Sequence, residues 1–207
     1  MRVVDYKSSK RTLDLWKVAE GLDLQLTTYL LALRENPASL AGAATVRPAG
    51  AFYARVYLAV RSPEKGRESD ENPEEPPGLK DFRLRGMFRE DAVGSLDCEV
   101  QGVGASSTLA VSYKKDGTPS ASGHDGLPEK AFDALLDLAA GRLRTIGRSI
   151  LDGRTAVEPY RHGKTSACRY CPFMDVCRFE PPENGYRFLE SVKRSEMVRR
   201  LEEERRG

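Results

Sequence analysis

The first 34 residues show two hydrophobic patterns in succession. Residues 2–7, RVVDYK, fit a short strand, which places Asp5 and Lys7 on one face because successive side chains of a strand alternate between faces. Apolar residues then recur at helical spacing over residues 13–34 and predict a helix. Gly21 interrupts this spacing, so we expect the helix to be divided in two.

Strand-like and helix-like segments continue to alternate along the chain. Residues 50–60 are rich in aromatic and β-branched side chains and favour a strand. Residues 61–80 have almost no apolar side chains and predict a mobile insertion, and residues 81–125 show no clear period. An apolar stripe over residues 128–151 predicts a helix, and residues 186–205 predict a charged helix with a thin apolar side. This alternation is typical of an α/β domain.

Composition narrows the class of protein. A length of 207 residues is enough for one domain, and a net charge of +2 is too small to indicate nucleic acid by itself. No segment is long and apolar enough to span a bilayer, and the start of the chain does not have the pattern of a signal peptide. We therefore expect a cytoplasmic protein with no membrane partner. In that compartment, its four cysteines favour a metal centre over disulfides.

Asp5 and Lys7 form the first candidate site. A carboxylate is a hard oxygen ligand suited to Mg²⁺, and a nearby lysine can orient water or stabilise developing negative charge. The pair therefore suits metal-assisted hydrolysis of a phosphodiester. Taken alone, the same spacing also fits an ordinary ion pair on an exposed strand face.

Gln25 and Tyr29 form the second candidate site. They are four residues apart, so a helix places them on one face. That face can look back towards the strand that carries Asp5 and Lys7. The alternative is a buried Tyr29 with an incidental Gln25.

Three cysteines form the third candidate site, in the sequence ACRYCPFMDVCRFEP. Cys168, Cys171 and Cys177 have the spacing C-x₂-C-x₅-C, which is one thiolate short of a four-coordinate zinc or iron–sulfur centre. Cys98 or His162 could complete a zinc site. Aromatic side chains close to these cysteines are expected to shield the metal from water: Tyr170, Phe173 and Phe179.

The ordered set of motifs resembles one bacterial family. RVVDYKSS, GLDLQLTTYL, PAGAFYARV, ILDGRTAVEPYR and the cysteine segment occur in this order in the AddB family, which belongs to the ATP-dependent helicase/deoxyribonucleases. The resemblance runs from residue 1 to about Tyr186. It implies the C-terminal part of a RecB-type nuclease domain with a restriction-endonuclease-like PD-(D/E)XK core, followed by a cysteine-rich metal-binding segment.

The resemblance also implies roles for individual residues. Asp5 matches the second metal-binding acid, the main-chain carbonyl of Tyr6 adds a ligand for Mg²⁺, and Lys7 matches the catalytic lysine. Gln25 and Tyr29 match the Q-x-x-x-Y motif, which positions the lysine and the DNA phosphates. The three clustered cysteines match three of the four ligands of a [4Fe–4S] cluster: Cys168, Cys171 and Cys177.

The resemblance is incomplete at the start of the chain. In the family, the first metal-binding Asp and the fourth cysteine precede the segment matched here, so we expect them upstream of Met1. Cys98 does not match a ligand and is expected to be an ordinary thiol. We therefore interpret residues 1–207 as a partial RecB-like nuclease domain, with the core over residues 1–60, an insertion over 61–127 and a helix, cysteine cluster and tail over 128–207. Alone, this chain is expected to have little or no nuclease activity.

Three functions remain open at this point. The first is a Mg²⁺-dependent DNA exonuclease in double-strand-break repair, whose AddA-like partner uses ATP that this chain does not bind. The second is a stand-alone iron–sulfur exonuclease similar to Cas4, although 138 residues lie between Tyr29 and Cys168. The third is a non-catalytic DNA-binding module held together by a metal.

Overall fold

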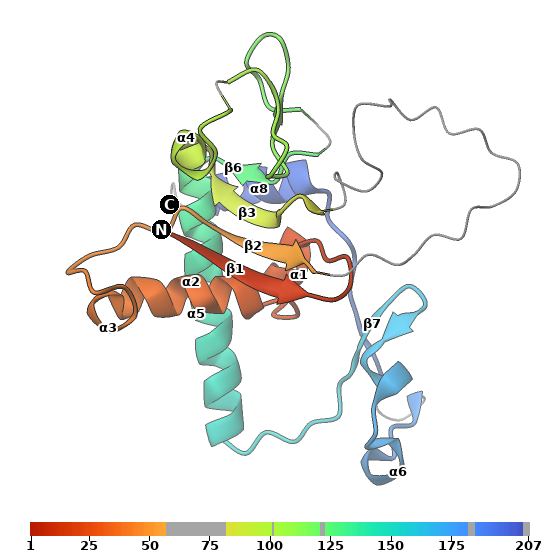
Figure 1. Ribbon diagram of the computed structural model, residues 1–207. Helices are drawn as coiled ribbons and strands as arrows, with labels where there is room; N and C mark the ends of the chain where they lie inside the picture. The colour runs from red at the N-terminus through yellow and green to blue at the C-terminus, as the bar shows by residue number, and fades with distance from the viewer. Residues whose placement is uncertain (57–81, 101, 121–122, 182–184, 205–207) are drawn as a thin grey trace, which may run out of the picture.

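A four-stranded sheet forms the centre of the computed structural model, which describes residues 1–56, 82–100, 102–120, 123–181 and 185–204. The strand order is β1-β2-β3-β6 (Figure 1). β1 and β2 are parallel, β2 and β3 are antiparallel, and β3 and β6 are parallel. Their bounds are Arg2–Lys7, Gly50–Arg55, Arg85–Arg89 and Gly126–Leu127. The predictions for residues 61–80 and for the end of the strand at 50–60 concern residues 57–81, which lie outside the described residues.

Helices cover one face of this sheet. The main core joins sheet residues such as Ala51, Met87 and Leu127 to the buried sides of four helices. These are α1 (Leu15–Ala19), α2 (Gln25–Glu35), α5 (Glu129–Leu151) and α8 (Arg194–Glu204). α5 packs against the other three, and Figure 1 shows it continuing past the sheet. No helix within the described ranges is long and apolar enough to cross a bilayer.

A loop-rich layer covers the other face. The next residue along each strand points to the opposite side, so Phe52 and Phe88 pack in a second core with Val100, Leu109 and Val111. This layer contains a 3₁₀ turn (Glu90–Ala92), α4 (Val93–Leu96), β4 (Gly104–Ala105) and β5 (Ser112–Tyr113). The middle of the sheet is therefore covered on both sides, which explains why all of β2 except Arg55 is buried.

The α/β class is confirmed, and most expected elements are present. The strand at residues 2–7 and the helix that follows residue 128 lie where the pattern predicts them. Gly21 has a φ of +77°, in the left-handed region that favours glycine, and it separates α1 from α2 as predicted.

Other elements differ from the expectations. α3 (Pro37–Ala41) lies between α2 and β2, where the sequence pattern indicates no element. Pro37 is tolerated at its start because the first N–H groups of a helix have no partner within the helix. The last helix begins at Arg194 rather than near residue 186, since residues 187–188 form β9. Two strands of the central sheet, β3 and β6, come from residues 82–127, most of which the sequence pattern left without a predicted element.

The cysteine segment forms a separate small unit. It contains β7 (Tyr160–His162), β8 (Thr165–Ser166), a 3₁₀ turn (Ala167–Tyr170), α6 (Met174–Cys177) and β9 (Arg187–Phe188). The three strands pair in the order β8-β7-β9, away from the main sheet (Figure 1). A ring contact links the unit to the main body, with the rings of His162 and Trp16 centred 4.8 Å apart.

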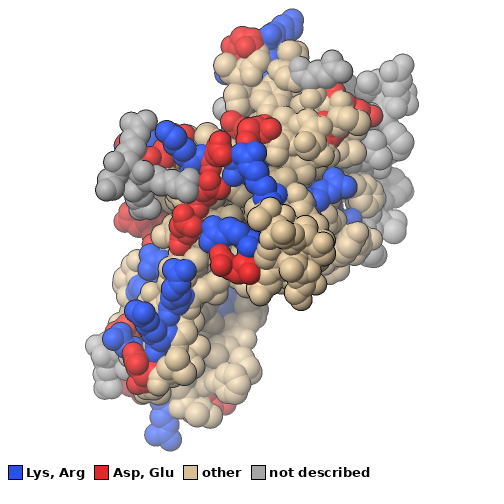
Figure 2. Space-filling model, turned by 90° about the vertical axis from the view of Figure 1, so that its left-hand side faces the viewer, with Lys and Arg blue, Asp and Glu red and all other residues tan. Residues whose placement is uncertain are grey.

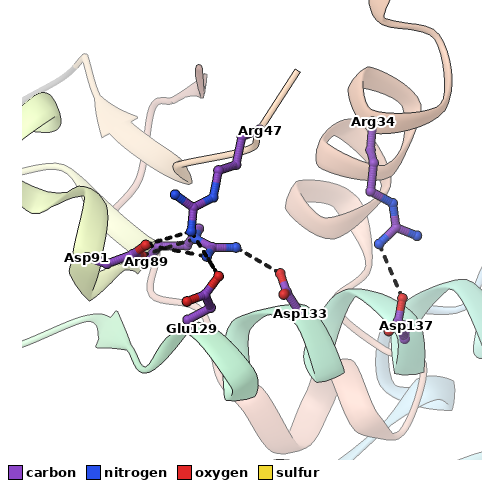
Figure 3. A network of polar contacts seen from close by, with 7 residues as sticks. All are labelled: Arg34, Arg47, Arg89, Asp91, Glu129, Asp133 and Asp137. Carbon is purple, nitrogen blue, oxygen red and sulfur yellow. Dashed lines mark hydrogen bonds and ion pairs between the residues drawn. The ribbon is translucent and has the colours of Figure 1, made fainter. Parts of the chain in front are cut away.

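A charged network joins β3 to α5. Arg89, at the end of β3, is 4% exposed and its guanidinium contacts Asp91, Glu129 and Asp133 (Figure 3). Arg47 contacts two of the same carboxylates, those of Asp91 and Glu129. Figure 2 shows acidic and basic side chains interleaved on one face of the molecule. Side chains of opposite charge that alternate in this way form structural ion pairs, whereas a surface that binds a charged partner carries mainly one sign of charge.

Candidate active site

The C-terminal half of β1 places an acid and a base together. Asp5 and Lys7 point to the helix-covered face of the sheet, and Lys7 Nζ lies 2.9 Å from Asp5 Oδ2. Both side chains are partly shielded, with 16% of Asp5 and 27% of Lys7 exposed. Tyr6, between them, is exposed on the opposite face. The predicted alternation therefore brings the two charged groups into contact.

The first turn of α2 completes a polar chain. Lys7 Nζ donates to Gln25 Oε1 at 2.8 Å, and Gln25 Nε2 donates to the Tyr29 hydroxyl at 2.8 Å. Leu26 and Leu30 are fully buried on the adjoining side of the helix, and their packing turns Gln25 and Tyr29 towards the end of β1. The four candidate residues at positions 5, 7, 25 and 29 thus form one connected group.

Tyr53 and Asp23 extend this group, and the sequence patterns pointed to neither. In the sheet, Tyr53 is the direct neighbour of Asp5, and its ring lies 5.7 Å from Lys7 Nζ. The Tyr53 hydroxyl donates to Asp23 Oδ1 at 3.0 Å. Burial, together with the negative charges of Asp23 and Asp5, raises the pKa of the Tyr53 phenol well above its usual value. Tyr53 therefore stays neutral and acts as a hydrogen-bond donor. The sequence contains no signal for the register that brings it to Asp5.

Two oxygen atoms at this end of β1 are suited to be ligands of a metal ion. Asp5 Oδ2 is buried and accepts no hydrogen bond, although it lies close to Lys7. Val56 N donates to Lys7 O, so the Lys7 carbonyl faces β2 and the preceding carbonyl, of Tyr6, faces the outer edge of β1. Within the described ranges, no group of three or more His, Cys, Asp or Glu side chains could hold a metal ion. These residues therefore fit part of a metal shell.

The three clustered cysteines share a pocket but are not assembled as a metal centre. They line a pocket of about 240 Å³ with Met174, Phe179 and Tyr186. The three thiols do not lie close enough together to bind one ion. No other group of three or more His, Cys, Asp or Glu side chains in the described part of the chain does so either. The expected aromatic shell is only partly present, since Phe179 lines the pocket whereas Tyr170 and Phe173 are 84% and 67% exposed. Cys98 is an exposed free thiol that does not line this pocket.

Comparison with known proteins gives the family. The sequence model described as the PD-(D/E)XK nuclease superfamily matches residues 1–178. Proteins named as the B subunit of an ATP-dependent helicase/deoxyribonuclease are similar over almost the whole chain. That of Lysinibacillus sphaericus (strain C3-41) is 35% identical over 209 aligned positions, covering 99% of this chain and 18% of the relative. Those of Bacillus mycoides (strain KBAB4) and Thermoanaerobacter sp. (strain X514) are 33% and 32% identical, with the same coverage.

The comparisons cover one part of longer proteins. This chain spans 18% of the length of these relatives, and the family that matches it is a superfamily of nucleases. The resemblance read from the motifs is confirmed, as is a mixed α/β nuclease fold. The chain therefore belongs to the PD-(D/E)XK nuclease superfamily.

Proposed function

We propose that this chain is a nuclease domain of an AddB-like protein and hydrolyses DNA phosphodiester bonds in double-strand-break repair by recombination. The observation that carries the proposal is the position of Lys7 Nζ, between Asp5 Oδ2 and Gln25 Oε1. The nuclease superfamily match and the names of the relatives support it. An AddA-like partner would bind and hydrolyse ATP.

Each residue of the polar chain has a distinct task in this proposal. Asp5 and the Tyr6 carbonyl hold Mg²⁺, which when bound activates water and stabilises negative charge. Gln25 fixes the Lys7 ammonium so that another of its hydrogens can be donated to a non-bridging phosphate oxygen. The Tyr29 hydroxyl accepts from Gln25, which leaves its own hydrogen to donate to the substrate.

The described residues supply an incomplete shell for Mg²⁺. This ion prefers six oxygen ligands, and one carboxylate with one main-chain carbonyl leaves most positions to water, substrate and carboxylates that these residues do not provide. We therefore expect this chain alone to cleave slowly.

The test is Mg²⁺-dependent degradation of labelled linear DNA at high enzyme concentration. The Lys7→Ala chain should lose about 100-fold or more of the measured rate. The Lys17→Ala chain, which loses a 40%-exposed lysine on α1, serves as the matched control and should keep that rate. Degradation that survives Lys7→Ala would disprove the role of the site. A wild-type turnover of about 1 s⁻¹ or faster would contradict the incomplete shell.

We also propose that Cys168, Cys171 and Cys177 bind a [4Fe–4S] cluster whose fourth ligand lies outside the described residues. Their shared pocket, lined by Phe179 and Tyr186, supports this proposal because apolar walls shield a cluster from water. Anaerobic reconstitution with iron and sulfide should produce broad visible absorption. Cys168→Ser should abolish this absorption and Cys98→Ser should retain it, and equal absorption in both variants would refute the assignment.

A further inference from the structure

Among the described residues, those that line a small pocket beside the polar chain are mostly cations. It lies where β1 and β2 end and β3 begins, and Tyr53 forms one wall. The other lining residues are Ser9, Lys10, Arg11, Arg55, Arg83 and Arg85. No carboxylate of the described residues lines it, so the pocket gathers positive charge on a chain whose net charge is close to zero.

Arg85 is a lining cation whose charge is neutralised by another residue of the fold. It makes two hydrogen bonds to Asp125, at 2.8 Å and 3.1 Å, and its role is therefore structural. The Nε atoms of Arg55 and Arg83, in contrast, are buried and have no hydrogen-bond partner among the described residues. A buried donor without an acceptor is unfavourable and rare in native proteins, so these two atoms point to an acceptor that the described residues do not supply.

The register of the sheet adds a second argument. Arg55 is the direct neighbour of Lys7 on the parallel strands β1 and β2, so the two cationic side chains share a face. Like charges on adjacent strands repel one another. Lys7 is compensated by Asp5, whereas Arg55 has no such partner among the described carboxylates. An anion bound next to Arg55 would remove this repulsion.

The size and place of the pocket indicate which anion it takes. Its volume of about 50 Å³ is roughly four times the space that one water needs, so phosphate oxygens can enter and a nucleobase cannot. Adjacent strands lie about 4.8 Å apart, which puts Arg55 one strand away from Lys7. We propose that Arg11, Arg55 and Arg83 form a phosphate subsite that binds the DNA backbone next to the phosphate held at Lys7. The choice of DNA rests on the proposed function.

Two binding assays without divalent metal test the subsite. In the first, fluorescence anisotropy follows a labelled single-stranded oligonucleotide over a salt series with the Arg55→Gln/Arg83→Gln chain. Affinity should fall about 10-fold and the salt slope should decrease by about 1, independently of sequence. The control is Arg144→Gln/Arg148→Gln, which removes two exposed arginines of α5 and should bind like the wild type.

The second assay separates the subsite from the proposed function. Inorganic phosphate should raise the thermal midpoint of the wild-type chain above its value in chloride at equal ionic strength, and should not raise that of the double variant. If phosphate stabilises the wild type while DNA does not bind, the subsite stands and the proposed DNA substrate fails. If phosphate does not stabilise the wild type, or the double variant equals the control in both assays, the subsite is wrong. Arg11→Gln, at an exposed residue, repeats the test should the double variant not fold.

Discussion

Replacing Arg89 with methionine should destabilise this protein strongly, because Arg89 is a nearly buried cation that holds three carboxylates. The guanidinium lies 3.1 Å from Asp91 and 3.0 Å from Asp133, and it also contacts Glu129. Burial acts to lower the pKa of Arg89, but hydrogen bonds to Asp91 and Glu129 outweigh it and raise that pKa. Methionine fills a similar volume and removes the charge, so the three carboxylates would face one another.

The expected loss of unfolding free energy is about 2–3 kcal/mol. Removing one partner of a fully buried ion pair typically destabilises by about 3–5 kcal/mol. The loss is smaller here because the carboxylates are 27–55% exposed and Arg47 still contacts two of them. In a chain of this length, the change corresponds to a fall of about 5–10 °C in the thermal midpoint.

Urea unfolding at pH 7 measures this loss, with Arg34→Met as the matched control. Arg34 is 32% exposed and pairs with the 56%-exposed Asp137, so its replacement should lower stability by about 0.5 kcal/mol or less (Figure 3). The reasoning is refuted if the two variants lie within about 0.5 kcal/mol of each other.

The same variant has a defined pH dependence. The hydrogen bond from Arg89 holds the pKa of Asp91 below its usual range. A depressed carboxyl pKa contributes stability that is fully present above about pH 4 and is lost as the pH falls through the lowered pKa. The difference between wild type and Arg89→Met should therefore shrink in acid.

Three further predictions concern the sheet, the core and the site. Gly86→Ala should lower the free energy of unfolding by about 1–3 kcal/mol, measured with urea, because the new Cβ would lie 2.2 Å from the Ala51 carbonyl oxygen and would push β2 away from β3. An unchanged free energy of unfolding would contradict this packing. Leu135→Ala, at a fully buried residue of α5, should lower it by about 2–5 kcal/mol, and a loss below about 1 kcal/mol would contradict its core position. In a titration that follows phenolate absorbance, with Tyr53→Phe as reference, Tyr53 should ionise at higher pH than an ordinary tyrosine. Asp23→Asn should lower the pKa of Tyr53, and an unchanged Tyr53 titration in this variant would count against the hydrogen bond between the two residues.

Local patterns predicted the parts of the site but not all of its neighbours. Alternation along β1 is enough to put Asp5 and Lys7 together, and helical spacing is enough to put Gln25 over Tyr29. Each rule acts within five residues, so neither needs knowledge of the fold. Tyr53 reaches this group through the register of two parallel strands, and that register depends on packing throughout the core.

The two strands of the central sheet that the sequence pattern missed have a similar explanation. β3 has only five residues and contains Gly86, and β6 has only two, so neither shows a periodicity long enough to recognise. Gly86 is needed because the backbone of β2 passes close to it. A close approach of this kind favours glycine and at the same time removes the apolar side chain by which a strand is recognised.

The charges around Lys7 explain why predicted and missed residues belong to one site. Asp5 contacts Lys7 and Asp23 accepts a hydrogen bond from Tyr53, and these carboxylates form an acidic side of the group. The arginines of the pocket that Tyr53 also lines form its basic side. The acidic side suits a cation, and the basic side suits an anion. Metal-assisted cleavage of a phosphodiester needs both at once, with a lysine where they meet. Asp5 and Lys7 were found because they are close in sequence, whereas Asp23 and the basic side, which draws on residues at the ends of β1, β2 and β3, join them only once the sheet has formed.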